Sequence, residues 1–183
     1  LTGLVGRAAA VADLRGLLDE HRLVTLTGPG GVGKTRLALE TATQAAATFP
    51  DGAWLAELAG LAGTRTPADA VIAVLGIRDD SSMDPADLLA EALRTSRMLL
   101  ILDNCEHVVD QAAKLTAQLL RVAPGLHILV TSREPLMVAG EYVWAVPPLP
   151  QSSAVQLFAM RAGAAAPGFR LDEGNAEAVA GLC

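Results

Sequence analysis

The residues with the clearest chemistry form one run, Gly28-Pro29-Gly30-Gly31-Val32-Gly33-Lys34-Thr35. The run fits the pattern G-x-x-x-x-G-K-[S/T], whose glycines let the backbone N–H groups point at phosphate oxygens. Lys34 can reach the β- and γ-phosphates of a nucleotide, and the Thr35 hydroxyl can bind Mg²⁺. The chain contains only one other lysine, Lys114, so a lysine at this position is informative. The run therefore predicts a nucleotide-binding loop.

The elements on either side of the loop match what it needs. An apolar run over residues 23–27 precedes it and is typical of a buried strand, and an Ala- and Leu-rich helical pattern follows over about 34–48. The N-terminus of such a helix favours negative charge, which suits phosphate.

Further apolar runs alternate with helical patterns along the chain. We expect strands at 53–58, 98–102, 127–130 and 142–146, and helices after Thr66 and Asp84 and over 107–122 and 153–162. This alternation predicts an α/β fold of three layers, with a parallel sheet between two layers of helices. We expect residues 1–150 to form the nucleotide-binding domain.

Polar residues follow two more of the expected strands, and parallel sheets bind ligands at the carboxyl ends of their strands. Asp103 ends one strand, where its carboxylate can hold Mg²⁺ beside Thr35 or, alternatively, cap the next helix. Asn104 follows and cannot act as a general base. Glu106 and Glu134 are candidate substitutes, although Glu106 also suits the first turn of a helix. We therefore expect slow hydrolysis.

Arg133 ends the other strand. A guanidinium at this edge can contact a γ-phosphate and so report whether it is present. The alternative is a surface ion pair with a neighbouring acid such as Glu134.

Composition excludes several classes of function. The chain has 183 residues, 51% of them hydrophobic, and a net charge of −6. It contains no basic run, so we expect no nucleic-acid contact by this segment, and its apolar runs are too short to span a membrane. Two cysteines are too few for a disulfide framework, which favours a cytoplasmic setting. Because the chain begins at Leu1 and ends in a helical pattern, we expect it to be part of a longer protein.

Several strings together resemble the STAND class of signalling NTPases, the NB-ARC-like group of the AAA+ branch. Within this class, the resemblance is to the ATPase modules of bacterial AfsR-type and LuxR-type transcriptional regulators. The strings Leu-Asp-Asn-Cys-Glu-His and Thr-Ser-Arg-Glu-Pro are the specific ones, because the phosphate loop alone is generic. The strings lie at residues 4–7, 21–35, 49–52, 100–107, 130–135 and 147–149.

The resemblance implies a P-loop NTPase fold with a five-stranded parallel sheet in the order 5-1-4-3-2. It also implies that residues 151–183 begin a small helical (ARC1-like) subdomain. Val5 and Arg7 would lie against adenine, mainly through backbone groups, and Arg133 would match the sensor arginine. The implied phosphate contacts are Gly28, Gly30, Gly31, Val32, Gly33, Lys34, Thr35 and Arg36.

The resemblance further implies a switch that is quiet with ADP and opens with ATP for homo-oligomerisation, working with other domains of the same chain in a signal-responsive transcriptional regulator. Other readings stay open. A small-molecule kinase would need a mobile lid and a second binding cluster, and neither is evident. A GTPase is weakened by the lack of an Asn-Lys-x-Asp string. A non-hydrolysing nucleotide-binding scaffold would keep Lys34, Thr35 and Asp103 and lose turnover.

Overall fold

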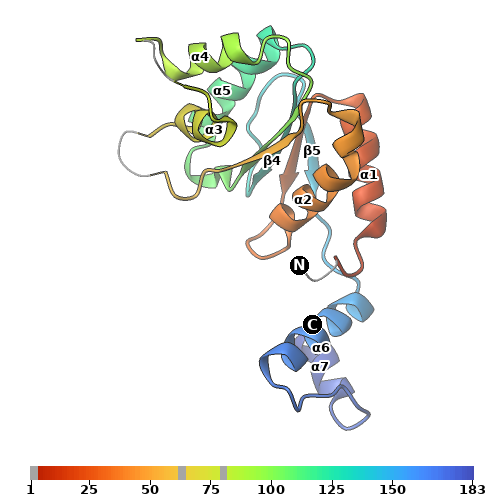
Figure 1. Cartoon of the computed structure of the whole chain (residues 1–183). Coiled ribbons are helices and arrows are strands. Elements are labelled where there is room, and N and C mark those ends of the chain that lie inside the picture. The colour runs from red at the N-terminus through yellow and green to blue at the C-terminus, as the bar shows by residue number, and fades with distance from the viewer. Residues whose placement is uncertain (1–3, 62–64, 79–81) are drawn as a thin grey trace.

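The computed structural model describes residues 4–61, 65–78 and 82–183 of the chain (Figure 1). Its strands are β1 (Leu23–Thr27), β2 (Ala53–Glu57), β3 (Leu99–Asp103), β4 (His127–Ser132) and β5 (Tyr142–Ala145). Its α-helices are α1 (Ala8–Glu20), α2 (Lys34–Ala45), α3 (Pro67–Leu75), α4 (Pro85–Ala92), α5 (Val109–Val122), α6 (Gln151–Ala165) and α7 (Ala176–Leu182). Two short 3-10 helices are η1 (Ala46–Thr48) and η2 (Cys105–His107).

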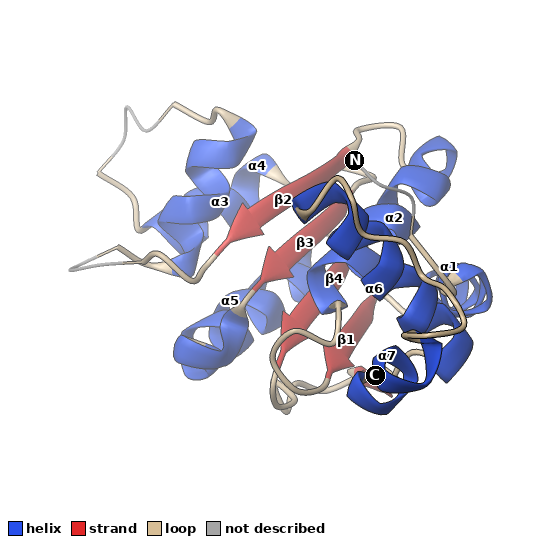
Figure 2. Cartoon of the chain, turned by 90° about the horizontal axis from the view of Figure 1, so that it is seen from below, coloured by secondary structure: helices blue, strands red, loops and turns tan. Residues whose placement is uncertain are grey.

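The five strands form one parallel sheet in the order β2-β3-β4-β1-β5 (Figure 2). Read from the opposite edge, this is the predicted order 5-1-4-3-2, so the expected sheet is confirmed. The register pairs Glu57 with Asp103 at the ends of β2 and β3, and Thr27 with Ser132 at the ends of β1 and β4. The carboxyl ends of these strands therefore meet at one edge of the sheet.

Helices cover both faces of the sheet, as the three-layer expectation requires (Figure 1). In β3, Leu100 and Leu102 face the core shared with α3, α4 and α5, whereas Leu99 and Ile101 face the core shared with α1 and α2. Because both faces of each central strand are buried, these strands are continuously apolar rather than alternating.

Helix starts agree well with the sequence where a cap is encoded. Thr66 caps α3, because its side-chain hydroxyl accepts a hydrogen bond from the backbone amide of Asp69. In return, the Asp69 carboxylate accepts a hydrogen bond from the backbone amide of Thr66. Asp84 caps α4 in the same position. Each cap supports its helix by about 1 kcal/mol.

Three predicted helices begin or end elsewhere than expected. The helix predicted over 153–162 is longer at both ends, as α6 (Gln151–Ala165). The helix predicted over 34–48 is α-helical only to Ala45 and continues as η1. The helix predicted from His107 begins at Val109, because Asn104 adopts a left-handed conformation (φ 58°, ψ 52°) and the next three residues form η2. This turn brings Glu106 back toward the edge of the sheet.

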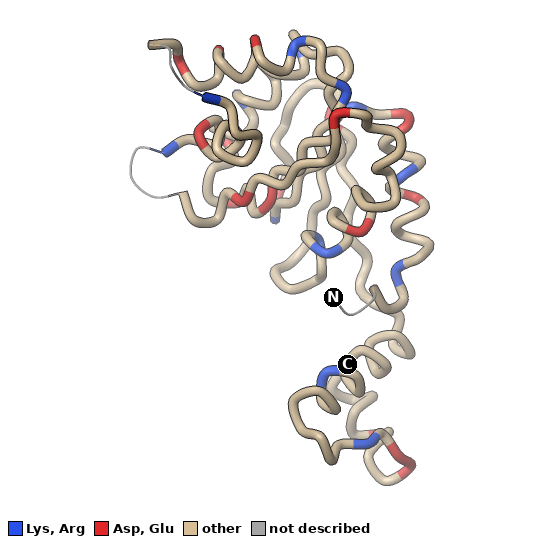
Figure 3. The backbone as a smooth tube through the Cα atoms, in the orientation of Figure 1, with Lys and Arg blue, Asp and Glu red and all other residues tan. Residues whose placement is uncertain are grey.

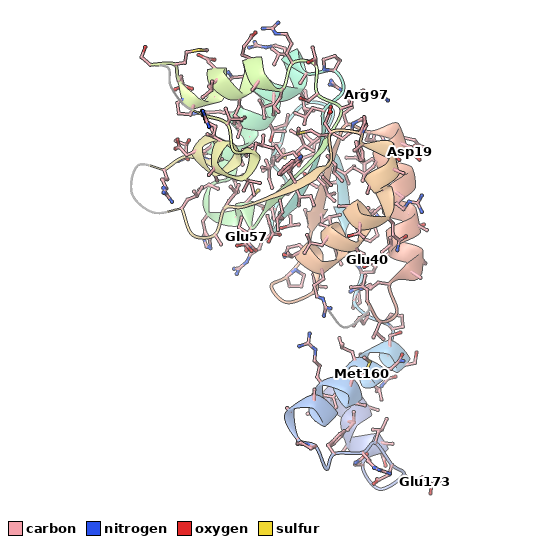
Figure 4. All side chains as sticks on the ribbon, viewed as in Figure 1. Asp19, Glu40, Glu57, Arg97, Met160 and Glu173 are labelled. Atoms are coloured by element: carbon pink, nitrogen blue, oxygen red, sulfur yellow. The ribbon has the colours of Figure 1, made fainter. Side chains whose placement is uncertain are left out.

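Helices α6 and α7 lie apart from the sheet, in the part that carries Met160 and Glu173 (Figures 1 and 4). None of the residues of α6 is fully buried, and Val179 is the buried residue of α7. The two helices meet through a hydrogen bond from the Gln151 side chain to the Ala180 carbonyl. No described helix is both long and apolar enough to cross a membrane.

Gly125, before β4, tests how tightly the sheet is packed against its loops. A Cβ atom there would lie 2.7 Å from the Ser96 carbonyl oxygen and 2.9 Å from Arg97 Cγ. We expect Gly125→Ala to lower the free energy of unfolding in urea by roughly 1–3 kcal/mol, because the backbone must shift. Gly16→Ala is the matched control: this site in α1 is open, so alanine should raise stability by up to about 1 kcal/mol. Equal stability of Gly125→Ala and the wild type would contradict the described packing.

Candidate nucleotide-binding site

The glycine-rich loop joins β1 to α2 and turns through left-handed backbone conformations. Gly31 has φ +80° and Gly33, the residue before α2, has φ +99°. A Cβ atom at either position would meet no described atom within 4 Å, so the backbone angle and not crowding favours glycine. The Leu37 amide then donates to the Gly33 carbonyl at 3.0 Å and starts the helix. The N-terminus of α2, where negative charge is favoured, thus lies at the end of the loop.

Lys34 lies over this loop rather than in solvent. Its side chain is largely buried, and Nζ donates to the carbonyl oxygens of Gly28 at 2.8 Å and Pro29 at 3.1 Å. These two bonds hold the ammonium against the carbonyl groups at the start of the loop. A phosphate bound there would meet a cation already in place.

Asp103 is the most buried charged group of the site, with 1% of its surface exposed. Its Oδ1 accepts hydrogen bonds from Thr35 Oγ1, at 2.7 Å, and from Thr131 Oγ1. Its Oδ2 accepts one from Asn104 Nδ2 at 3.2 Å. The carboxylate therefore joins the first turn of α2 to the ends of β3 and β4.

The alternative reading of Asp103, as a helix cap, is wrong. Asn104 occupies the position before η2, and Val108 the position before α5, with no capping bond from either side chain. The Asp103 carboxylate is turned instead toward Thr35. A hydroxyl and a carboxylate oxygen this close form the all-oxygen donor set that Mg²⁺ prefers, so these residues fit the ion.

Arg7 ties three segments together beside the loop. Its Nη1 donates to the Pro147 carbonyl at 2.6 Å and its Nη2 to the Val32 carbonyl at 3.1 Å. Burial lowers the pKa of the guanidinium, which nevertheless stays charged in a protein. Its side chain is thus bonded to carbonyl groups of the chain itself, and the contact of Val5 and Arg7 with adenine stays a prediction.

A hollow of 180 Å³ lies between the N-terminal residues around Arg7, the glycine-rich loop and α6. Six of the predicted contact residues line it, and Gly28, Gly30, Lys34 and Thr35 lie outside it. The other four lining residues were not predicted as contacts, and two of them, Leu157 and Arg161, belong to α6, which only the fold brings here. The predicted group is Val5, Arg7, Gly31, Val32, Gly33 and Arg36, and the unpredicted group is Leu4, Leu149, Leu157 and Arg161. Ligand pockets usually measure about 300–1,000 Å³, so this hollow suits one part of a nucleotide.

Arg133 pairs with an acid other than the one suggested by sequence proximity. Its Nε lies 3.3 Å from Glu106 Oε1, and Glu134 forms none of the ion pairs found among the described residues. The Nη2 atom of Arg133 lies 3.8 Å from the point where a Cβ atom on Gly30 would sit. The guanidinium thus faces the glycine-rich loop.

Comparison with known proteins places this geometry in a family. A family model of the NB-ARC domain matches residues 9–163. The chain belongs to the NB-ARC family. Among solved structures, it is similar to a STAND protein with a tetratricopeptide repeat sensor from Pyrococcus horikoshii. The TM-score is 0.62 and the identity 19%, and the match covers 100% of this chain and 28% of that one.

Bacterial relatives share more of the sequence with this NB-ARC chain. It is 40% identical to Mycobacterium tuberculosis protein Rv0894, over 100% of this chain and 47% of that protein. A candidate HTH-type transcriptional regulator of the same species, Rv0890c, is 43% identical over 93% of this chain and 19% of its own length. The regulatory protein AfsR of Streptomyces griseus is 34% identical over 87% of this chain and 17% of its own length. The chain thus spans about half or less of the length of these relatives, and the predicted resemblance is confirmed.

Sequence analysis missed Thr131 as a partner of Asp103. The signal was present in the order of the strands: β3 and β4 are neighbours with Leu102 opposite Val130, so the next residues, Asp103 and Thr131, are also adjacent. The Thr131 hydroxyl also accepts a hydrogen bond from the Asn104 amide at 3.0 Å. Thr131 therefore orients the candidate metal-binding carboxylate of the NB-ARC domain.

Cys105 is a fully buried thiol beside the carboxylates of this site. Burial, with smaller effects from Asp103 and Glu106, raises the pKa of its thiol to about 12. Only the thiolate reacts with a disulfide reagent, so at pH 8 we expect Cys105 to react at least about a hundredfold more slowly than exposed Cys183. A count of reactive thiols, before and after unfolding in urea, checks this. Two equally fast thiols in the folded protein would contradict it.

Proposed function

We propose that this NB-ARC domain is an ATP- and ADP-binding regulatory switch that hydrolyses ATP slowly. The observation that carries the proposal is the meeting of Lys34, Thr35 and Asp103 at the carboxyl edge of one parallel sheet. Ligands of such sheets bind at this edge. The Lys34 ammonium, the N-terminus of α2 and the oxygen pair of Thr35 and Asp103 are three features that suit a magnesium-bound polyphosphate.

Each residue has a role in this proposal. Residues 28 and 30–36 bind the phosphates, and the backbone around Val5 and Arg7 borders adenine. Thr35 and Asp103 would hold Mg²⁺, which neutralises charge on the β- and γ-phosphates when bound. Lys34 stabilises negative charge on the same phosphates. Arg133 senses the γ-phosphate.

Slow turnover follows from Asn104. Its amide donates to Asp103 Oδ2, and an amide cannot remove a proton from water. A site that binds tightly and hydrolyses slowly holds each nucleotide long enough to report a state. This favours a switch over a motor.

The arrangement of the chain also supports switching. We propose that residues 1–150 form the nucleotide-binding domain and that residues 151–183 begin a helical subdomain. Because Leu157 and Arg161 of α6 line the same hollow as the loop, a bound nucleotide would contact both parts. A change of nucleotide can then move one part relative to the other.

The names of two relatives support a place in a cytoplasmic, multidomain transcriptional regulator. Its partners would be other domains of the same chain and, in one nucleotide state, further copies of it. Lys and Arg residues are spread along the chain with Asp and Glu residues among them (Figure 3). With a net charge of −6, direct nucleic-acid contact would fall to another domain, and we propose no membrane contact.

A different site is the main structural alternative. A larger hollow of 520 Å³ lies where the starts of α3 and α4 meet α5, and Arg65 and Lys114 line it. It would suit the second substrate of a kinase. However, Thr66 and Asp84 already cap both helices there, which leaves fewer open amides for an anion.

The two lysines of the chain separate these sites. We expect Lys34→Ala to weaken Mg·ADP binding at least about a hundredfold by isothermal titration calorimetry, because a charge-assisted phosphate contact is lost. Lys114→Ala is the matched control and should bind as the wild type does. A Lys34→Ala affinity within about threefold of the wild type would sink the phosphate-loop assignment. Loss of binding in Lys114→Ala would place the ligand in the larger hollow.

A further inference from the structure

Glu106 is a carboxylate with few partners in a nearly buried position. Its side chain is 12% exposed, and Oε2 is buried without a hydrogen-bond partner among the described residues. Its Oε1 lies 3.3 Å from Arg133 Nε. Burying a carboxylate is costly unless it is paired, so this contact with Arg133 is what offsets the burial.

The backbone before Glu106 explains why it reaches this place. Asn104, which directly follows β3, has a left-handed backbone conformation, and Cys105 and Glu106 then turn within η2. The Val108 amide closes this turn on the Cys105 carbonyl at 2.9 Å, and the Cys105 side chain is fully buried beneath it. The backbone that carries Glu106 is therefore held in one conformation.

Arg133, in contrast, has a long side chain that is 64% exposed. An exposed arginine loses considerable rotamer entropy when a ligand fixes it. The contact with Glu106 uses Nε, and the guanidinium is planar, so one bond at Nε restricts the direction of the terminal nitrogens. Nη2 is directed toward Gly30 of the loop.

We propose that Glu106 is a positioning residue that holds Arg133 with its terminal nitrogens facing the glycine-rich loop, and so sets the preference of the site for ATP over ADP. The inference rests on the proposed nucleotide site and deepens it. Only ATP has a γ-phosphate for Arg133 to contact. Because Glu106 fixes Arg133 before binding, less rotamer entropy is lost when that contact forms, and this gain in affinity applies to ATP alone. Glu106 does not act as the general base, because Arg133 engages its carboxylate.

The test is a double-mutant cycle read by binding. Dissociation constants are measured for Mg·ADP and for a magnesium-bound ATP analogue with a non-hydrolysable β,γ-imido bridge. We expect Arg133→Ala to shift the affinity ratio toward ADP about tenfold. Glu106→Ala should shift it the same way by about three- to tenfold and change nothing further in Arg133→Ala protein.

Two further variants show whether the effect of Glu106→Ala comes from lost positioning of Arg133, from the lost negative charge or from disturbed folding. Glu106→Gln should retain the ATP preference, because its amide oxygen can still accept from Arg133 Nε. Asp110→Ala is the matched control. Glu106 and Asp110 both line a third hollow, of 500 Å³, which also borders residues 134–137, but Asp110 forms none of the ion pairs of the described residues. The Asp110→Ala variant should keep the wild-type ratio. If Glu106→Ala does not fold, Glu106→Leu takes its place: its side chain is of similar size but cannot accept a hydrogen bond from Arg133 Nε, so it should lose the preference in wild-type protein and change nothing further in Arg133→Ala protein.

Distinct results would overturn the inference. An unchanged ratio in Glu106→Ala, with the ratio lost in Arg133→Ala, would show that Glu106 does not act through Arg133. Lost hydrolysis with an unchanged ratio would make Glu106 the base instead. Additive effects would make the two residues independent. Failure of the wild type to bind either nucleotide would overturn the proposed function as well, which distinguishes that failure from the others.

Discussion

The site depends on the hydrogen-bonded carboxylate of Asp103. Almost fully buried, it accepts bonds from Thr35, Thr131 and Asn104, which belong to α2, β4 and the turn after β3. A buried carboxylate needs such donors, because an unpaired one would cost several kcal/mol or would take up a proton. The same donors bring the loop, the sheet and the following turn into fixed positions. The need to satisfy one negative charge thus shapes the whole edge of the sheet.

From this edge, structure extends in two directions. Through Thr131 and Ser132 the sheet leads to Arg133, whose guanidinium lies between Glu106 and the loop. On the other side, Arg7 connects the loop to the segment that enters α6 by bonding the carbonyls of Val32 and Pro147. One charged group therefore lies on each side of the loop. In the proposed switch, Arg133 reads the γ-phosphate, and Arg7 holds the segment before α6 against the loop.

Much of this arrangement could be predicted because it depends on local pattern. The spacing of Lys34 and Thr35 in a glycine-rich run determines their place at the start of a helix, and an apolar run ending in Asp103 locates that carboxylate at a strand end. The pairing of Arg133 with Glu106 was not predictable in this way. It depends on the left-handed turn at Asn104, a conformation that asparagine tolerates but that no periodicity reports. Likewise, α6 reaches the hollow only through tertiary packing, because its weakly buried surface carries no signal of what it faces.

The most direct test of the account is a titration of the isotope-labelled chain with Mg·ADP, followed through its backbone amide NMR signals. The account predicts saturable shifts that are largest over residues 28–36, with further shifts at 5–7 and 131–133. Shifts confined to the residues around Arg65 and Lys114 would contradict it, because the nucleotide would then bind between α3, α4 and α5. The absence of any saturable shift at millimolar ADP would contradict the nucleotide site altogether.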